Sequence, residues 1–124
     1  MEDRAPHVLL VEDDPDTREM YSFYLSYSGL HVTEARTGRR ALERAREERP
    51  DVVVTDIAMP EMDGLELSRR LRAEEPTHDV PIIAVSGQAS DRARQAGADI
   101  VLEKPCQPDH LLRAIEYVLS DHRD

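Results

Sequence analysis

The sequence predicts an α/β protein built from five strand–helix units, with a doubly wound parallel sheet covered by helices on both faces. Short β-branched or apolar runs alternate along the chain with segments of helical periodicity. Most of these runs are apolar throughout, as strands buried on both faces are. Alternating units of this kind build a parallel sheet, and right-handed crossovers leave only a few topologies.

Five short segments are expected to form the strands. They are residues 8–11, 31–34, 52–55, 82–85 and 100–102. The second is half polar and gives the weakest signal, whereas the third is β-branched throughout. The fourth follows Pro81 and stops at Ser86-Gly87, a turn sequence. Strands of this length and composition fit the interior of a small α/β sheet.

Helices are expected between these strands, over residues 16–28, 38–48, 65–74, 89–96 and 108–120. The last carries the clearest apolar stripe at 3.6-residue spacing. Pro108 suits its first turn. Gly29 and Gly97 stand where the first and fourth helices should stop. The fourth helix is short and weakly apolar, which predicts a reduced fourth unit.

Length and composition indicate one domain over residues 1–124, with its core at about residues 6–120. No apolar stretch reaches the roughly 18 residues of a membrane helix, and the N-terminus lacks a signal-peptide pattern. Cys106 is the single cysteine and excludes an internal disulfide. These features fit the cytoplasm. The net charge of −10 argues against direct binding to nucleic acid or to an acidic membrane.

Polar residues that could bind a ligand or take part in a reaction follow four of the five expected strands. In an open α/β sheet the site lies beyond the carboxyl ends of the strands, so these residues should converge. They are Glu12, Asp13, Asp14, Asp56, Ser86, Glu103 and Lys104. Lys104 is the only lysine, and the other 15 basic residues are arginines. An ammonium is a compact point charge that differs in kind from the planar fork of arginine.

Converging carboxylates repel one another unless a proton or a cation lies between them. Hard oxygen ligands suit Mg²⁺, and an aspartate can attack phosphorus to form an aspartyl-phosphate. Lys104 and the metal would neutralise the transferred group, and Ser86 would donate a hydrogen bond to it. Alone, each residue has an ordinary structural reading, as a solvated loop acid or a turn residue. Together at four strand ends, they predict a phosphate and metal site.

The chain resembles the response-regulator receiver domain of two-component signalling, in the CheY-like superfamily, over nearly its whole length. The resemblance rests on the segments 8–14 (VLLVEDD), 51–64 (DVVVTDIAMPEMDG), 81–87 (PIIAVSG), 96–99 (AGAD) and Lys104-Pro105. Any one piece is weak, but the set in this order is specific. It implies a flavodoxin-like fold with strand order 2-1-3-4-5.

The resemblance also implies a role for each acid. Asp56 would be the phosphoacceptor and a metal ligand. Asp13 would bind Mg²⁺ directly, with Mn²⁺ as an alternative ion, and Glu12 would act through metal-bound water. The backbone carbonyl of Ala58 would complete the protein ligands.

Further roles follow for the residues around the phosphate. Ser86 would be the switch hydroxyl, and Lys104 would pair with the phosphate or with unmodified Asp56. The Lys104–Pro105 peptide bond would be cis, an isomer found mainly before proline. Ala58 and Gln88 would modulate dephosphorylation. Ala58 cannot orient an attacking water, whereas Gln88 can, so the phosphoryl lifetime stays open.

The function implied is a signalling switch. The domain would accept a phosphoryl group from a sensor histidine kinase or a phosphotransfer protein and change a protein-interaction surface. It would catalyse only its own phosphorylation and dephosphorylation and would not be an enzyme in the usual sense. No output domain is expected in this chain, which would be a stand-alone receiver or a module of a longer one. It would be a monomer or a phosphorylation-dependent dimer, with the kinase, stimulus and target undetermined.

Three features depart from the family pattern. The aromatic residue expected three positions before the lysine is Val101, so a ring-flip readout is not expected. The position after Lys-Pro holds Cys106 in place of an apolar aromatic. Only 18 positions separate Ser86 from Lys104, which predicts a truncated fourth helix and an altered output surface.

The first predicted helix holds four of the five aromatic residues. They are Tyr21, Phe23, Tyr24 and Tyr27. The helix places Met20, Tyr24 and Tyr27 on one side. The four rings cannot all face one core, so they either share core and boundary positions or form a partner-docking patch. In the family the first helix contacts the kinase, which favours the patch.

The five histidines have no metal-ligand spacing and are expected at the surface. They are His7, His31, His78, His110 and His122.

Two other functions compete with the switch. A Mg²⁺-dependent phosphohydrolase with Asp56 as nucleophile usually needs a second carboxylate two residues later, and that residue is Ala58. A constitutive receiver-like scaffold, never phosphorylated, is disfavoured by the intact acids, hydroxyl and lysine. Val101 and the short fourth unit leave the scaffold hypothesis open.

Overall fold

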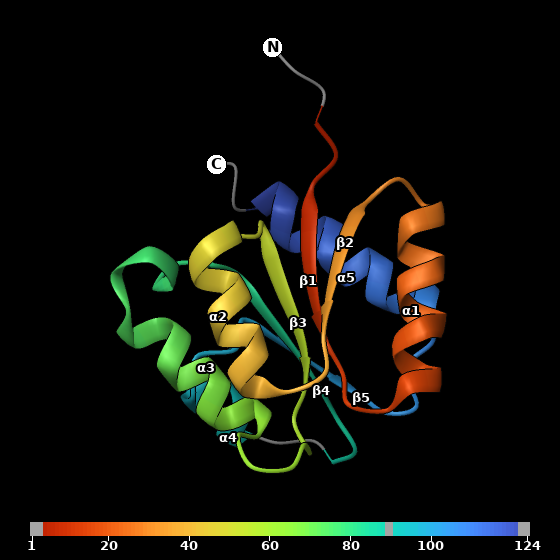
Figure 1. The fold of residues 1–124 in the computed structure, drawn as a ribbon. Coiled ribbons are helices and arrows are strands. Elements are labelled where there is room, and N and C mark those ends of the chain that lie inside the picture. The colour runs from red at the N-terminus through yellow and green to blue at the C-terminus, as the bar shows by residue number, and fades with distance from the viewer. Residues whose placement is uncertain (1–3, 89–90, 122–124) are drawn as a thin grey trace.

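The computed structural model describes residues 4–88 and 91–121, and their strands form one parallel sheet (Figure 1). The sheet order is β2-β1-β3-β4-β5. The strands are β1 (His7–Val11), β2 (His31–Ala35), β3 (Val52–Asp56), β4 (Ile82–Ser86) and β5 (Ile100–Glu103). The predicted fold class, strand order and strand positions are confirmed, with ends shifted by a residue.

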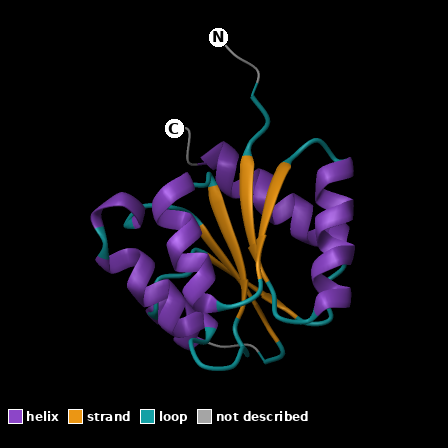
Figure 2. Cartoon of the chain, in the orientation of Figure 1, coloured by secondary structure: helices purple, strands orange, loops and turns teal. Residues whose placement is uncertain are grey.

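Helices cover both faces of the sheet (Figure 2). They are α1 (Pro15–Tyr27), α2 (Gly38–Glu48), α3 (Gly64–Ala73), α4 (Asp91–Gln95) and α5 (Pro108–Asp121), with a 3-10 turn η1 (Glu75–Thr77) after α3. α1 and α5 pack on one face, and α2, α3 and α4 pack on the other (Figure 1). Within the described residues, no helix combines the length and apolarity that a membrane span needs.

The core divides into two clusters because successive side chains of a strand point to opposite faces. On β1, Leu9 and Val11 pack with α2 and α3, whereas Val8 and Leu10 pack with α1 and α5. All four are at most 1% exposed. Burial on both faces explains why this strand is apolar without alternation.

Caps and glycines set the helix ends. Asp14 accepts a hydrogen bond from the Thr17 N–H at the start of α1, and Asp63 accepts one from the Glu66 N–H at the start of α3. Such caps satisfy amide groups that have no partner within the helix. Gly29, which follows α1, has φ 99° and so adopts the backbone region that favours glycine. Gly97 has φ 116°, and both expected helix ends are confirmed.

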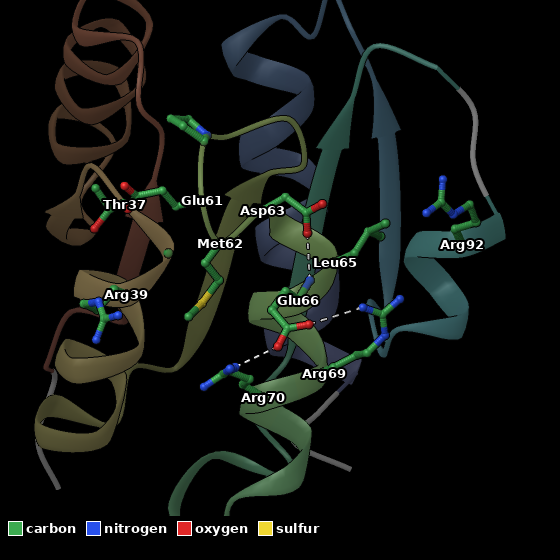
Figure 3. A pocket seen from close by; sticks show the side chains of 12 residues that line it. Thr37, Arg39, Glu61, Met62, Asp63, Leu65, Glu66, Arg69, Arg70 and Arg92 are labelled. Atoms are coloured by element: carbon green, nitrogen blue, oxygen red, sulfur yellow. Dashed lines mark hydrogen bonds and ion pairs between the residues drawn. The ribbon is translucent and has the colours of Figure 1, made fainter.

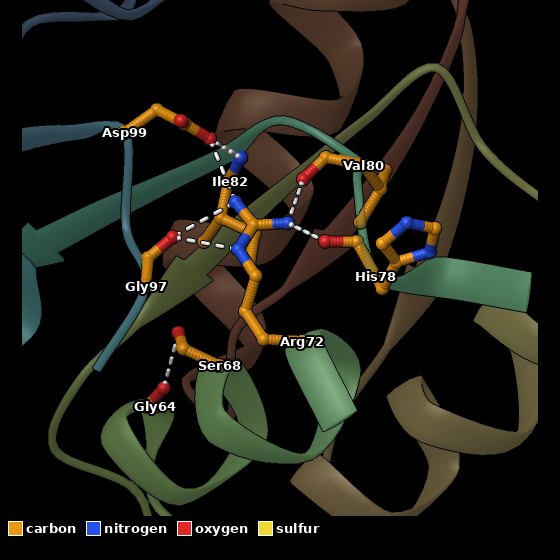
Figure 4. A network of polar contacts seen from close by, with 8 residues as sticks. All are labelled: Gly64, Ser68, Arg72, His78, Val80, Ile82, Gly97 and Asp99. Carbon is orange, nitrogen blue, oxygen red and sulfur yellow. Dashed lines mark hydrogen bonds and ion pairs between the residues drawn. The ribbon is translucent and has the colours of Figure 1, made fainter. Parts of the chain in front are cut away.

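The fourth helix is short in the described part of the chain, as predicted: α4 spans Asp91–Gln95. Two residues of the predicted segment 89–96, namely 89 and 90, lie outside the described residues. The turn after α4 is held by Arg72 of α3, whose guanidinium donates to Gly97 O, His78 O, Val80 O and Asp99 Oδ2 (Figure 4). One arginine therefore joins α3, the segment before β4 and the start of β5.

The side of α1 that faces the sheet differs from the stripe of Met20, Tyr24 and Tyr27. Tyr21 and Leu25 are the buried residues of α1, while Met20 is 44% and Tyr27 is 85% exposed. Tyr24 is half-buried, and Phe23 is 72% exposed. The aromatics thus divide between core, boundary and surface, because aromatic spacing alone does not reveal which side meets the sheet.

The prediction that the histidines lie at the surface was wrong for His7. Its side chain is 15% exposed, and its ring centroid lies 4.7 Å from that of His31 on the neighbouring strand. Parallel pairing aligns the two residues directly, which the chain order does not reveal. His31, His78 and His110 are exposed as expected, and His122 lies outside the described residues.

Candidate functional site

The carboxyl ends of β1, β3, β4 and β5 meet at one edge of the sheet, the lower edge in Figure 1. Glu12 and Asp13 follow β1, Asp56 ends β3, Ser86 ends β4 and Lys104 follows β5. Backbone bonds tie these ends together: Ile57 N–H donates to Val85 O, and Lys104 N–H donates to Ser86 O at 2.7 Å. The edge therefore brings together these five of the seven residues predicted from the strand ends. Of the other two, Asp14 caps α1 and Glu103 is exposed at the end of β5.

Three carboxylates form the centre of this edge. Oxygen atoms of Glu12, Asp13 and Asp56 all lie within 4.8 Å of one another, and we call these three residues the carboxylate cluster. Glu12 and Asp56 are each 5% exposed, whereas Asp13 is exposed. Two buried negative groups at this distance repel each other unless a positive charge is near.

Lys104 supplies one positive charge. Its Nζ lies 2.8 Å from Asp56 Oδ1. This buried oxygen accepts no hydrogen bond among the described residues, so the ammonium is its nearest source of positive charge. Partial burial lowers the pKa of Lys104, but the carboxylates of Asp56, Glu12 and Asp13 outweigh it and the pKa is raised. The ammonium thus stays charged beside Asp56.

Glu12 shows the cost of gathering acids here. Burial raises the pKa of Glu12, and the charge of Asp56 raises it further. The Asp14 N–H opposes this by donating to Glu12 Oε2 at 3.1 Å. The cluster therefore holds excess negative charge that one lysine does not fully balance.

The loop after β3 is shaped by a close approach at Gly64. A Cβ at this position would lie 2.4 Å from the Asp56 carbonyl oxygen, so only glycine fits. The Gly64 N–H also donates to Ile57 O at 2.8 Å. α3 thereby begins directly against the end of β3, and the loop that contains exposed Ala58 is held next to the carboxylate cluster.

Ser86 is buried, with 7% exposure. Its hydroxyl donates to Gln88 O at 2.5 Å and accepts from the Gln88 N–H at 3.1 Å. The hydroxyl is therefore engaged with its own loop. The Gln88 side chain is exposed on that loop.

The segment after β5 has a contact that no sequence signal indicated. Tyr21 of α1 donates from its hydroxyl to the Cys106 carbonyl at 2.7 Å, two residues after Lys104. Burial, together with the contact to Cys106, raises the pKa of Tyr21 to about 12, so the phenol remains a donor. The Lys104–Pro105 peptide bond is cis, the isomer that the resemblance implies.

The residues present fit a divalent cation. Three carboxylates offer hard oxygen atoms, and Asp56 Oδ1 is buried without a hydrogen-bond donor among residues 4–88 and 91–121. Mg²⁺ is bound in proteins by one or two carboxylates with water and phosphate oxygens, so this cluster suits it.

The fold and the site define a class: an open parallel α/β protein with a buried, lysine-paired aspartate among further acids at the switch-point edge. Residues 8–116 match the family model described as the response regulator receiver domain. The chain therefore belongs to the response regulator receiver domain family and is a signalling module of two-component systems.

Relatives and solved structures agree with this family. DivK of Brucella anthropi, a polar-differentiation response regulator, is 32% identical over 92% of this chain and 96% of its own. The chemotaxis response regulator CheY4 of Vibrio cholerae has a TM-score of 0.87 at 32% identity, covering 92% of this chain and 98% of its own.

A third similar protein was solved with a metal ion. It is the receiver domain of the sensor histidine kinase PA1611 from Pseudomonas aeruginosa PAO1, with a magnesium ion coordinated in its active-site cleft. Its TM-score is 0.86 at 32% identity, and the match covers 94% of this chain and 98% of that one.

Proposed function

We propose that the protein is switched by phosphorylation of Asp56 in a Mg²⁺-dependent reaction. The observation that carries the proposal is the buried Asp56, paired at 2.8 Å with Lys104 inside the carboxylate cluster. An Asp56 oxygen would form a bond to phosphorus as the phosphorus–nitrogen bond of a donor phosphohistidine breaks and the imidazole leaves.

Glu12, Asp13, Asp56 and the backbone carbonyl of Ala58 would hold the metal, with Mn²⁺ as an alternative ion. A bound Mg²⁺ neutralises charge on the transferred group. Support comes from the raised pKa of Glu12, caused first by burial and then by the neighbouring Asp56, because a bound cation would favour the ionised carboxylate there. The PA1611 receiver domain, which has magnesium in its cleft, supports the same ion here.

Ser86 and Lys104 would then read the phosphate. Phosphorylation adds charge and acceptor oxygens that favour nearby donors. Lys104 already lies against Asp56, whereas the Ser86 hydroxyl would have to exchange its bonds with Gln88 for one to the phosphate. That exchange would move the loop after β4, and a loop with two arrangements is a common switch. Ala58 and Gln88 remain the proposed modulators of dephosphorylation.

The proposed phosphodonor is a sensor histidine kinase or a phosphotransfer protein, as is general for the family. The outer side of α1 supports docking there. Phe23 and Tyr27 are 72% and 85% exposed, their rings stack 6.3 Å apart, and Met20 lies alongside. Exposed aromatics of this kind are enriched at protein interfaces. We place the protein in the cytoplasm, without direct nucleic-acid or membrane binding, as a monomer or a phosphorylation-dependent dimer.

The alternatives are weaker. A constitutive scaffold would have no need for a buried Asp56 whose charge must be balanced by Lys104. A phosphohydrolase would require an acid/base two residues after Asp56, and exposed Ala58 provides none. We propose self-directed phosphorylation and dephosphorylation as the only chemistry of this domain.

Intact-protein mass spectrometry after treatment with acetyl phosphate and Mg²⁺ tests the proposal. Wild type should gain one phosphate, Asp56→Asn should gain none, and Asp79→Asn, which removes an exposed aspartate, should behave as wild type. If wild type stays unmodified even with a histidine kinase or phosphotransfer protein supplied, the hypothesis of a constitutive scaffold replaces that of a phosphorylation switch.

A further inference from the structure

A cleft of about 550 Å³ lies between α2, the β3–α3 loop, α3 and α4 (Figure 3). Four arginines line it: Arg39 from α2, Arg69 and Arg70 from α3, and Arg92 from α4. We call it the arginine cleft. None of its lining residues belongs to the carboxylate cluster, and the proposed phosphorylation makes no use of the four arginines.

The acids in the arginine cleft do not cancel this charge. Glu66 is shared, with Arg70 Nε at 2.8 Å and Arg69 Nη1 at 3.6 Å from its carboxylate. Asp63 is engaged as the cap of α3. With Glu61, three carboxylates face four guanidinium groups in a chain whose net charge is −10. A local positive excess against that background is the reverse of what a generally acidic surface predicts.

The helices on the two sides of the sheet differ in the same direction, although two arginines of α2 and α3 pair with Glu74 and Asp99 outside these helices. α2, α3 and α4 together carry nine arginines and five acids. α1 and residues 108–120 of α5 carry two arginines and four acids. Frequent use of arginine across the chain does not explain why the arginines gather on these helices, and a local positive charge favours encounter with a negatively charged partner.

The arginine cleft is open to a partner. Arg69 and Arg70 have side-chain exposures of 55% and 52%. Arg39 is exposed as well, and no carboxylate of residues 4–88 or 91–120 lies within ion-pair distance of it. Within residues 91–121, α4 comprises the five residues Asp91–Gln95, so little of its described length stands beside α3.

We propose that the arginine cleft binds an acidic segment of a partner protein, with Asp or Glu side chains on the arginines and an apolar side chain against Met62. The guanidinium fork matches a carboxylate with two parallel hydrogen bonds, and arginine clusters are a common means of recognising acidic motifs. A nucleic acid fits less well. Among the described residues that line the cleft there is no aromatic ring for bases to stack on, and its three carboxylates would repel phosphates.

This inference goes beyond the proposed function and does not depend on it, because the cleft is formed without a phosphate. One wall, the β3–α3 loop at residues 60–63, continues from the segment after Asp56. A bound acidic segment would therefore contact the loop that connects the carboxylate cluster to α3.

The test uses the full, unphosphorylated chain and a short fluorescein-labelled peptide of alternating Glu and Leu, followed by fluorescence anisotropy at about 0.15 M salt, where the Debye length is about 8 Å. The double variant Arg39→Gln/Arg69→Gln should bind about tenfold more weakly than wild type. The control Arg40→Gln/Arg113→Gln removes the same charge from residues that are 61% and 68% exposed and do not line the cleft. It should bind within about twofold of wild type, as screened surface charges do.

Equal weakening of both variants would overturn the inference, since attraction would then be diffuse. Absence of peptide binding to wild type, or displacement of the peptide by single-stranded RNA at lower concentration than by unlabelled peptide, would overturn it too. Circular dichroism establishes that both variants are folded. The phosphate adduct on Asp56 is measured separately, so failure of either proposal can be recognised without the other.

Discussion

The Nζ atom of Lys104 lies 2.8 Å from Oδ1 of Asp56, across the β3–β4–β5 side of the sheet. Asp56 is 5% exposed and Lys104 39%, so the pair joins a buried carboxylate to a half-exposed ammonium. Removing one partner of such a pair leaves the buried charge uncompensated. Stability measurements can therefore reveal this relationship without any phosphodonor.

For Lys104→Met we expect the free energy of unfolding to fall by about 1–2 kcal/mol, less than for a fully buried pair because Lys104 is partly solvated. Urea denaturation at pH 7 in EDTA measures it. Asp56→Asn should reverse most of the loss when combined with Lys104→Met, because the buried charge is then gone. Additive effects of the two substitutions would show that the pair is not coupled.

Glu12→Gln should stabilise the protein at pH 7 in EDTA. The folded-state pKa of Glu12 is raised above its ordinary value of 4.5, chiefly by burial. The unfolded chain therefore loses this proton at a lower pH than the folded chain, and the ionised group destabilises the fold at neutral pH. The advantage of the variant should shrink as the pH falls through the raised pKa towards 4.5. It should also shrink when Mg²⁺ is added to both proteins.

The measurement for Glu12 is the thermal midpoint between pH 4.5 and 7, with and without Mg²⁺. Glu116→Gln, on the exposed side of α5, serves as the control and should leave the pH profile unchanged. A variant that is less stable than wild type at every pH would contradict the assignment of Glu12 as a strained carboxylate.

His7 should lower the free energy of unfolding in mild acid. Burial lowers its pKa from 6.5, and the neighbouring His31 lowers it further, against opposing effects of Glu48 and Asp51 and a small lowering by Arg44. The unfolded chain then binds the proton first, so stability present above pH 6.5 is lost as the pH falls below it. His7→Gln should flatten that part of the profile, measured by urea denaturation from pH 5 to 8. His110→Gln, at an exposed position, should not.

Arg72→Ala should lower the free energy of unfolding by about 2–3 kcal/mol, because several backbone carbonyls lose their guanidinium donor together and Asp99 loses its ion pair. Arg70→Ala, which removes one exposed ion pair with Glu66, should cost less than about 0.5 kcal/mol. Hydrogen exchange should show the loss of protection concentrated at the turn before β5. Similar costs for both variants would mean that the Arg72 contacts add no more than a surface pair.

Much of the fold was predictable because it depends on local rules. Val52 to Thr55 forms a strand buried on both faces because four β-branched residues in a row suit that environment. Gly29 and Gly97 end helices because their positive φ angles are easily reached only without a Cβ. The meeting of Asp56 and Lys104 was predictable for a related reason: parallel strands share one direction, so the residues after them gather at one edge.

Other features depend on packing between distant elements, and the spacing of residues in the sequence does not predict them. The sheet-facing side of α1 is set by Tyr21 and Leu25, not by the stripe that begins at Met20, because four aromatics at close spacing offer more than one apolar side. The Tyr21 hydroxyl reaches the Cys106 carbonyl only because α1 and α5 cover the same face. His7 meets His31 through strand register alone.

The sequence by itself determined the βα order, the helix ends and the residues that gather at the carboxyl edge, since these depend on side-chain type and on one shared strand direction. Tertiary structure decided which partners those residues take: Ser86 bonded to Gln88, Asp56 Oδ1 buried against Lys104, and arginines from three helices lining one cleft. The physical reason is that rotamers and distances between elements are settled only when the helices pack on the sheet.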